Sequence, residues 1–364
     1  MKIYIAVIDA DLIGRKKHRF PNLACEKISG YWKNQNADVV LKTDYEDLDI
    51  FDKVYISKVF TDTPVPEGVL HLENVEYGGT GFFYDKAPNL PDEIEHSFPD
   101  YHLYDEWINE QDRPKNEFKE YINYSIGFLT RGCFRKCSFC VNQKYNHVFE
   151  HSPLEEFYDP SRKKICLLDD NFLGCPNWKE LLQKLIDTGK PFKFKQGLDE
   201  RLLTDEKCEM LFNCKYDGDI TFAFDNIEDY DLIEKKLQLI RRYTDKRCMF
   251  YVLCGFDKSK KYDEQFWYQD IIDTFRRIEL LMNYKSYPYI MRFNKYVESP
   301  YRGLYVTLGR WCNQQSFFKR MSLYEFCEQT LKHGSASSLK YMNEWLQKHS
   351  ETEKYFHMKW KVGD

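Results

Sequence analysis

Short apolar runs alternate with amphipathic stretches in the first part of the chain, and this pattern predicts an α/β domain. Residues 3–8 form a continuous apolar run, as expected of a strand that is covered on both faces. A helix is predicted next, because apolar side chains recur there at helical spacing, at Ala24, Ile28, Tyr31 and Trp32. Three more short strands are predicted at residues 39–41, 54–56 and 69–72. This order favours a small doubly wound parallel sheet.

A second series of longer units starts near Glu120. Candidate strands are residues 122–129, 164–168, 192–195, 220–224, 249–253 and 289–293, with helices between them at 178–188, 230–243 and 268–283. Residues 82–118 are predicted to be an ordered linker, because a flexible tether would be poorer in aromatic side chains. At the C-terminal end, a polar loop is predicted at residues 310–315 and helices at 322–333 and 338–349, separated by Gly334.

Composition and charge limit the class of protein. The chain has 364 residues, which is long enough for two or three domains, and its 43% of hydrophobic residues suffices for a core. A formal net charge of −5 gives no general attraction to nucleic acid, so that partner is not indicated. Residues 15–19 form a local basic segment, which a solvated loop explains at least as well.

Apolar patterning and cysteine content bear on the compartment. No apolar run approaches the roughly 18 residues that span a bilayer, and Asp9 and Asp11 end the first run too early for a signal peptide. We therefore expect no membrane association. Twelve cysteines without secretion indicate a reducing compartment, so we expect a cytoplasmic protein with reduced thiols.

Three of the cysteines are spaced C-x₃-C-x₂-C, at Cys133, Cys137 and Cys140. Thiolates this close in sequence can serve one metal centre, and iron–sulfur clusters are held by cysteine thiolates. Two alternatives remain open. The cysteines can be unrelated core residues, although charged residues lie between them, or they can bind zinc with His147 or His151 as the fourth ligand.

The segment resembles the motif of the radical S-adenosylmethionine (radical SAM) superfamily, C-x₃-C-x-Φ-C, with Phe139 in the aromatic position Φ. The resemblance implies a [4Fe–4S] cluster held by the three cysteines, whose open iron chelates S-adenosylmethionine (SAM). It also implies that one electron cleaves SAM to a 5′-deoxyadenosyl radical, which abstracts hydrogen from a substrate that the sequence does not identify. An electron donor such as flavodoxin or ferredoxin is the implied partner.

The same resemblance implies a domain organisation. Residues 116–300 are expected to form a partial (β/α)₆ TIM-type barrel, with the cysteine motif after its first strand, and residues 301–364 a helical C-terminal extension. Residues 1–115 resemble the cobalamin-binding-like, Rossmann-type domain of a radical SAM subgroup, whose sheet is flavodoxin-like. The overall fold class is therefore expected to be α/β.

Parallel barrels place their reacting groups at the carboxyl ends of the strands, which selects further candidates. After the second strand, Asp169, Asp170 and Asn171 are expected to bind the ammonium group of SAM, and the alternative is a helix-capping cluster. After the third, Arg201 is expected to bind its carboxylate, and the alternative is a surface salt bridge with Asp205.

The fourth and fifth strands supply the remaining candidates. Asp225 is expected to contact the ribose or the amino group of SAM, and Gly255 to let the backbone approach the adenine. Cys254 is a candidate catalytic residue that returns a hydrogen atom to a substrate radical. It is expected, like Cys312, to face the barrel mouth, whereas most other cysteines outside the motif are expected to be buried.

The N-terminal segment bears on cobalamin. The signature D-x-H-x-x-G of the subgroup appears here as residues 9–14, with Asp11 in place of the histidine that binds cobalt. A carboxylate is not equivalent to an imidazole. Cobalamin is therefore possible but doubtful, and the alternative is a domain that serves for docking or shape.

These observations predict a radical SAM enzyme that abstracts hydrogen from an unidentified substrate. One alternative is a cobalamin-dependent radical SAM methyltransferase. The other is a non-catalytic binding protein in which zinc or a cluster has a structural role.

Overall fold

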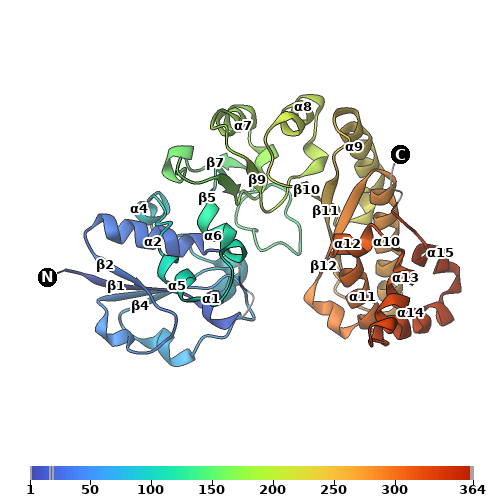
Figure 1. Cartoon of the computed structure of the whole chain (residues 1–364), viewed down its shortest axis with the longest axis horizontal. Coiled ribbons are helices and arrows are strands. Elements are labelled where there is room, and N and C mark those ends of the chain that lie inside the picture. The colour runs from blue at the N-terminus through green and yellow to red at the C-terminus, as the bar shows by residue number, and fades with distance from the viewer. Residues whose placement is uncertain (1, 16–17, 19, 361–364) are drawn as a thin grey trace. The chain divides into compact units, whose positions relative to one another are not determined.

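The computed structural model describes residues 2–15, 18 and 20–360 (Figure 1). Lys16, Lys17 and Arg19 of the basic segment lie outside the described residues. The chain forms two compact units, Met1–Lys195 and Gln196–Asp364. Their boundary falls inside the range predicted for the barrel, so the predicted division into three domains stays a prediction. In the described ranges, no helix is both long and apolar enough to cross a membrane.

The first unit begins with a four-stranded parallel sheet in the order β2-β1-β3-β4 (Figure 1). The strands are β1 (Tyr4–Asp9), β2 (Asp38–Leu41), β3 (Lys53–Ser57) and β4 (Val75–Gly78). The α/β class and the first three predicted strands are confirmed. The fourth prediction is wrong, because residues 69–71 belong to the 3₁₀ turn Glu67–His71. Val69 and Leu70 pack against the core from this turn without joining the strand ladder.

Different kinds of element cover the two faces of this sheet. Helix α2 (Leu23–Asn34) packs on one face, where Cys25 and Ile28 share a core with Ile5 and Val7 of β1. The helix starts there because the Asn22 side chain accepts hydrogen bonds from two backbone N–H groups of its first turn. The other face is covered by the short helix α1 (Ala10–Gly14) and by the 3₁₀ turns Leu48–Ile50 and Glu67–His71.

The predicted linker is ordered. It contains the short helices α4 (Asp92–Glu95) and α5 (Asp105–Glu110). Helix α3 (Thr80–Phe83) overlaps its start, and α6 (Lys119–Asn123) follows its end. Tyr101 and Tyr104 are buried, as the aromatic content predicted. The Tyr104 hydroxyl donates to Asp9 Oδ2 over 3.0 Å, and the Tyr101 hydroxyl donates to the carbonyl of Ile126 over 3.1 Å. The linker therefore connects the first sheet to the strand that follows it.

The rest of the first unit carries a second parallel sheet, β5 (Tyr124–Gly127), β8 (Lys164–Leu167) and β9 (Phe192–Phe194), in that order. Helix α7 (Trp178–Asp187) connects β8 to β9. After β5 the chain forms a small antiparallel hairpin, β6 (Thr130–Arg131) and β7 (Phe149–Glu150). The cysteine motif lies within the loop of this hairpin.

The second unit contains the parallel sheet β10 (Ile220–Ala223), β11 (Cys248–Cys254) and β12 (Ser286–Arg292). Its helices α8 (Asp205–Asn213), α9 (Tyr230–Tyr243) and α10 (Glu264–Asn283) alternate with the strands. The six strands predicted for the barrel thus occur where they were expected, three in each unit.

The C-terminal segment is helical, as predicted. It contains α11 (Arg302–Cys312), α12 (Gln315–Phe318), α13 (Leu323–Lys332), α14 (Ser337–Lys348) and α15 (Glu353–Phe356). Ser322 and Glu325 form a capping box at the start of α13, and Gly334, with φ +84°, separates α13 from α14. The loop predicted at residues 310–315 is partly wrong, because residues 310–312 are the last turn of α11.

Candidate functional site

The three cysteines of the motif lie directly after β6, on residues 132–142, which we call the cysteine loop. The loop turns at two residues with positive φ, Gly132 at +90° and Lys136 at +50°. Only glycine fits the first position, because a Cβ there would lie 2.3 Å from the carbonyl oxygen of His147. Nε2 of Gln143 donates to the Cys140 carbonyl over 2.9 Å and so closes the turn.

The thiols of this loop differ from most other cysteines in exposure and in polar contacts. The partly exposed cysteines are Cys133, Cys137, Cys140 and Cys214, and the others are buried. The backbone N–H of Arg135 and the side-chain Nδ2 of Asn171 each donate to Cys133 Sγ over 3.4 Å. The backbone N–H of Asn142 donates to Cys140 Sγ over 3.4 Å. These hydrogen bonds fix the positions of two of the three thiols.

The residues after β8 hold the residues at the start of the cysteine loop. Asp169 Oδ1 accepts from the backbone N–H of Thr130 over 2.6 Å and from its hydroxyl over 2.7 Å. Asp170 Oδ2 accepts from the backbone N–H of Gly132 over 2.8 Å. Together with the Asn171 contact, these bonds bring the three predicted residues against the motif.

Asp169 is turned into the protein. Its side chain is buried, and burial raises the pKa of this carboxyl to about 7, although the Thr130 hydrogen bonds oppose the shift. Because its oxygens already bind the backbone of Leu129 and Thr130, Asp169 supports the start of the loop. Binding of SAM by Asp169, Asp170 and Asn171, and the role of half-buried Phe139, stay predictions.

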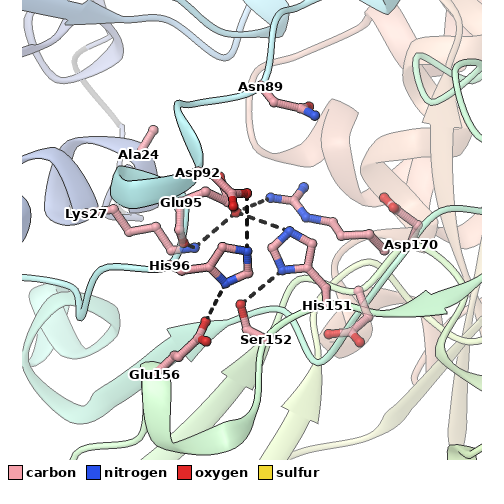
Figure 2. Close-up of polar contacts among 12 residues, drawn as sticks. Ala24, Lys27, Asn89, Asp92, Glu95, His96, His151, Ser152, Glu156 and Asp170 are labelled. Carbon is pink, nitrogen blue, oxygen red and sulfur yellow. Dashed lines mark hydrogen bonds and ion pairs between the residues drawn. The ribbon is translucent and has the colours of Figure 1, made fainter.

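A partly buried ionic cluster includes Arg131 of β6 and His151, which directly follows β7 (Figure 2). We call it the Glu95 cluster: Lys27, Glu95, His96, Arg131, His151 and Glu156. Glu95 Oε1 lies 3.0 Å from Lys27 Nζ and 2.9 Å from Arg131 Nη2. Burial alone would raise the pKa of Glu95, but the two cations lower it below its ordinary value. Glu95 therefore stays ionised between Lys27 of α2 and Arg131 of β6.

Two histidine rings adjoin the carboxylate of the Glu95 cluster. They are stacked, with ring centroids 5.2 Å apart (Figure 2). His151 Nε2 lies 3.5 Å from Glu95 Oε1, and its Nδ1 lies 3.0 Å from Ser152 Oγ. His96 Nδ1 lies 2.8 Å from Glu156 Oε2. His151, one of the two alternative zinc ligands, therefore has both ring nitrogens beside other groups.

In the second unit, helix α10 organises the strand ends that carry Asp225 and Gly255. Nη1 of buried Arg277 donates to the carbonyls of Asp225 and Leu253, each over 2.8 Å. Asp270 Oδ2 accepts from the Gly255 N–H over 2.8 Å, and Gly255 has φ +76°. Burial raises the pKa of Asp225 to about 6, which Arg277 opposes. Side chains of one helix thus form hydrogen bonds with the backbone of both predicted residues.

Cys254 and Cys312 lie in the packed interior of the second unit, with exposed fractions of 1% and 0%. Neither thiol reaches the surface that the predicted position at a barrel mouth requires. Burial raises the pKa of both thiols. Transfer of a hydrogen atom by Cys254 stays a prediction.

Arg201 is engaged within the second unit. Its Nε lies 2.7 Å from Asp199 Oδ1, and its Nη1 lies 3.1 Å from Asp229 Oδ2. The alternative prediction, a salt bridge between Arg201 and Asp205, is wrong, because Asp205 pairs with Arg242. Binding of the SAM carboxylate by Arg201 stays a prediction.

The loop that resembles the cobalamin signature is closed by its aspartate. Asp11 is fully buried, its Oδ2 accepts from the Val59 N–H over 2.7 Å, and its Oδ1 accepts from the Thr63 hydroxyl. The carboxylate thus joins helix α1, which directly follows β1, to the loop after β3. It does not fit the role of a cobalt ligand, and no step of the chemistry below uses a corrinoid.

The loop thiols fit an iron–sulfur cluster by the chemistry of their donors. All three cysteines are partly exposed, and N–H groups donate to the thiols of Cys133 and Cys140. Each cysteine of a cubane binds a different iron, so the thiols need not meet at one point. Within the part of the chain that the structure describes, no three His, Cys, Asp or Glu side chains are grouped to hold a single metal ion.

Sequence reasoning missed three residues that organise these sites: Glu95, Asp270 and Arg277. Glu95 comes from a linker helix, far in sequence from the residue that it binds. Arg277 and Asp270 lie on the amphipathic helix α10, where charged residues are ordinary. Arg277 falls on the apolar, core-facing side of this helix, where a charged residue is unusual, and this position is the signal that could have identified it.

Comparisons with known proteins add little to these observations. No family model matches the chain, and no curated protein matches it. Among solved structures, the chain is similar to the cobalamin-dependent S-adenosylmethionine radical enzyme OxsB. For the form with aqua-cobalamin bound the identity is 14% and the TM-score 0.37, and for the form with aqua-cobalamin and S-adenosylmethionine they are 14% and 0.36. For the apo form they are 15% and 0.38.

Each of these alignments covers 80% of this chain and 49% of the OxsB chain. The chain therefore spans about half the length of the structures that it matches. Similarity at this identity and TM-score assigns neither a family nor an activity, so the proposals below depend on the residues of the site.

Proposed function

We propose that this chain is a radical SAM enzyme in which Cys133, Cys137 and Cys140 hold a [4Fe–4S] cluster. The observation that carries the proposal is the cysteine loop itself. Three partly exposed thiols lie on one tight turn after β6, and a side chain from the end of β8 donates to one of them. Three protein ligands leave one iron of a cubane open, and the amino and carboxylate groups of SAM are suited to chelate it.

When bound, the cluster supplies one electron that cleaves SAM to methionine and a 5′-deoxyadenosyl radical, which abstracts hydrogen from a substrate still to be identified. The chain's own residues bind and orient. Asp170 and Asn171 hold the loop through Gly132 and Cys133. Orientation of this kind before electron transfer is what a protein contributes to cofactor chemistry.

The remaining assignments are part of the same proposal. Asp170 and Arg201 would hold the charged ends of the methionine moiety, and Asp225 and Gly255 the nucleoside. A reduced flavodoxin or ferredoxin would supply the electron, in the cytoplasm. The buried position of Asp169 favours a supporting role over direct contact with SAM.

Anaerobic purification followed by iron and sulfide analysis tests the proposal. We expect about four irons and four sulfides per chain, and loss of both when the three loop cysteines are replaced by alanine. Cys214→Ala is the matched control, because Cys214 is also partly exposed but lies outside the motif. With dithionite and SAM, the wild type should release 5′-deoxyadenosine and the triple variant should not.

The opposite results are equally specific. Zinc without labile sulfide would support the structural-metal alternative. If the triple variant keeps its iron, the ligands of the iron must be other residues of the chain. A loaded cluster that does not cleave SAM would leave an iron–sulfur protein without the proposed activity.

A further inference from the structure

Four consecutive residues, the two of β6 and the first two of the cysteine loop, each form a hydrogen bond with a different side chain. Asp169, Asp170 and Asn171, which follow β8, contact Thr130, Gly132 and Cys133 respectively. The remaining residue, Arg131, donates to Glu95 of α4 over 2.9 Å. Of these four side chains, Glu95 is the one that does not come from the segment after β8.

The carboxylate of Glu95 also connects Arg131 to the N-terminal sheet. Lys27, on the helix that covers that sheet, lies 3.0 Å from the same Glu95 oxygen. Its Nζ donates to the Glu95 backbone carbonyl as well. The side chains of Lys27 and Glu95 are only 5% and 12% exposed, so water screens this contact weakly.

We infer that the N-terminal domain acts as a support for the cysteine loop, and that Glu95 is the positioning residue through which it acts. The inference rests on the proposed function in so far as the loop holds a cluster. It assigns a role to a domain whose signature loop, closed by Asp11, does not fit cobalamin. Arg131 lies two residues before Cys133, so the direction of its side chain constrains the backbone at the first ligand.

The chemistry predicts what happens when the anion is lost. Glu95→Gln removes the charge that separates Lys27 from Arg131, and two cations then face each other at a site that is largely shielded from water. Arg131 then faces a neutral amide oxygen in place of a carboxylate, so its charge-assisted hydrogen bond is lost. Glu93→Gln is the matched control, because Glu93 lies on the same helix α4 but is exposed.

A double variant separates positioning from simple repulsion. Lys27→Met/Glu95→Gln removes one cation together with the anion, so no pair of like charges remains, but Arg131 still lacks its carboxylate partner. If Glu95 positions the loop, the double variant should behave like Glu95→Gln. The melting temperatures of Glu95→Gln and of the double variant distinguish loss of positioning from unfolding, because unfolding would lower both.

Two measurements on the full chain test the inference. In the metal-free protein, trypsin should cut at the exposed Lys136 of the loop roughly tenfold faster in Glu95→Gln and in the double variant than in the wild type or Glu93→Gln. In the iron-loaded protein, a ferrous chelator should remove iron faster in the same two variants, and the electron paramagnetic resonance signal of the reduced cluster should change shape.

The two measurements fail in distinguishable ways. A wild type without iron would reject the proposed function, while the trypsin comparison would still decide whether Glu95 holds the loop. Equal trypsin rates in wild type, Glu95→Gln and the double variant would overturn the inference. So would wild-type iron release and an unchanged signal in a loaded double variant.

Discussion

At the scale of single residues, His151 has the protonation state that its surroundings constrain most clearly. Burial, followed by the positive charge of Arg131, lowers the pKa of His151 from 6.5 to about 4, and Glu95 opposes the shift. Lys27 and His96 also face the ring and favour its neutral form. The imidazole is therefore neutral at physiological pH.

This depressed pKa predicts a pH dependence of stability. As the pH falls below 6.5, the unfolded chain takes up a proton at His151 before the folded chain does. The stabilising contribution is therefore complete above about pH 6.5 and is lost as the pH falls towards 4. His151→Gln should lose less unfolding free energy than the wild type between about pH 7 and about pH 5.

Chemical denaturation of the full chain at both pH values measures this difference. His102→Gln is the control, since His102 pairs with Asp105 at the surface and its side chain is 77% exposed. The control should keep the wild-type dependence. A His151→Gln protein with the same dependence as the wild type would show that folding does not lower the pKa of His151.

At the scale of elements, helix α10 holds the carboxyl ends of β10 and β11 through one buried arginine. Nη1 of Arg277 binds three strand-end carbonyls, those of Phe224, Asp225 and Leu253. Arg277→Met should lower the free energy of unfolding by about 3–5 kcal/mol, because it leaves buried acceptors and carboxylates without their cation. Denaturant titration measures the loss.

The adjacent residue provides an internal comparison for this element. Arg276 forms a partly exposed ion pair with Asp273 at 3.5 Å, and such pairs contribute about 1 kcal/mol or less. Arg276→Met should therefore be nearly neutral. Similar losses in both variants would mean that the contacts of Arg277 with the strand ends contribute little.

At the scale of the whole molecule, the N-terminal sheet has the strand order of a ligand-binding α/β domain, but the buried Asp11 occupies its carboxyl edge. In open parallel sheets, ligands bind at the carboxyl edge where the strand order reverses, here between β1 and β3. Asp11 joins helix α1 to the loop after β3 at this position through Val59 and Thr63. These hydrogen bonds engage both carboxylate oxygens of Asp11, the residue that stands in place of the cobalt-binding histidine.

We therefore predict that the chain does not retain cobalamin. After equilibration with hydroxocobalamin and desalting, the visible spectrum should show no stoichiometric corrinoid, in the wild type and in Asp11→Asn alike. Stoichiometric retention by the wild type would contradict the prediction. It would also make cobalamin-dependent methyl transfer the leading reaction.

The sequence by itself determined the elements and the candidate metal ligands. Strands such as β1, β3 and β11 are apolar runs of the right length, and α9 and α13 carry helical periodicity with clear ends, so local pattern suffices. Residues 69–72 show the limit of this reasoning. A four-residue apolar run fits a strand or a turn equally well, and only packing against the sheet decides between them.

The tertiary structure alone decided how the site is held. Cysteine spacing is local, so it is readable from the chain, whereas the contacts of Glu95 with Arg131 and of Asp11 with Thr63 join residues that are distant in sequence. The orientation of Asp169 towards the backbone of β6, and the burial of Cys254, likewise follow from which elements pack together. A charged side chain has the same appearance in a sequence whether it meets solvent, cofactor or a buried partner. Its role is set by the free energy of burial and pairing, which depends on neighbours that only the fold brings near.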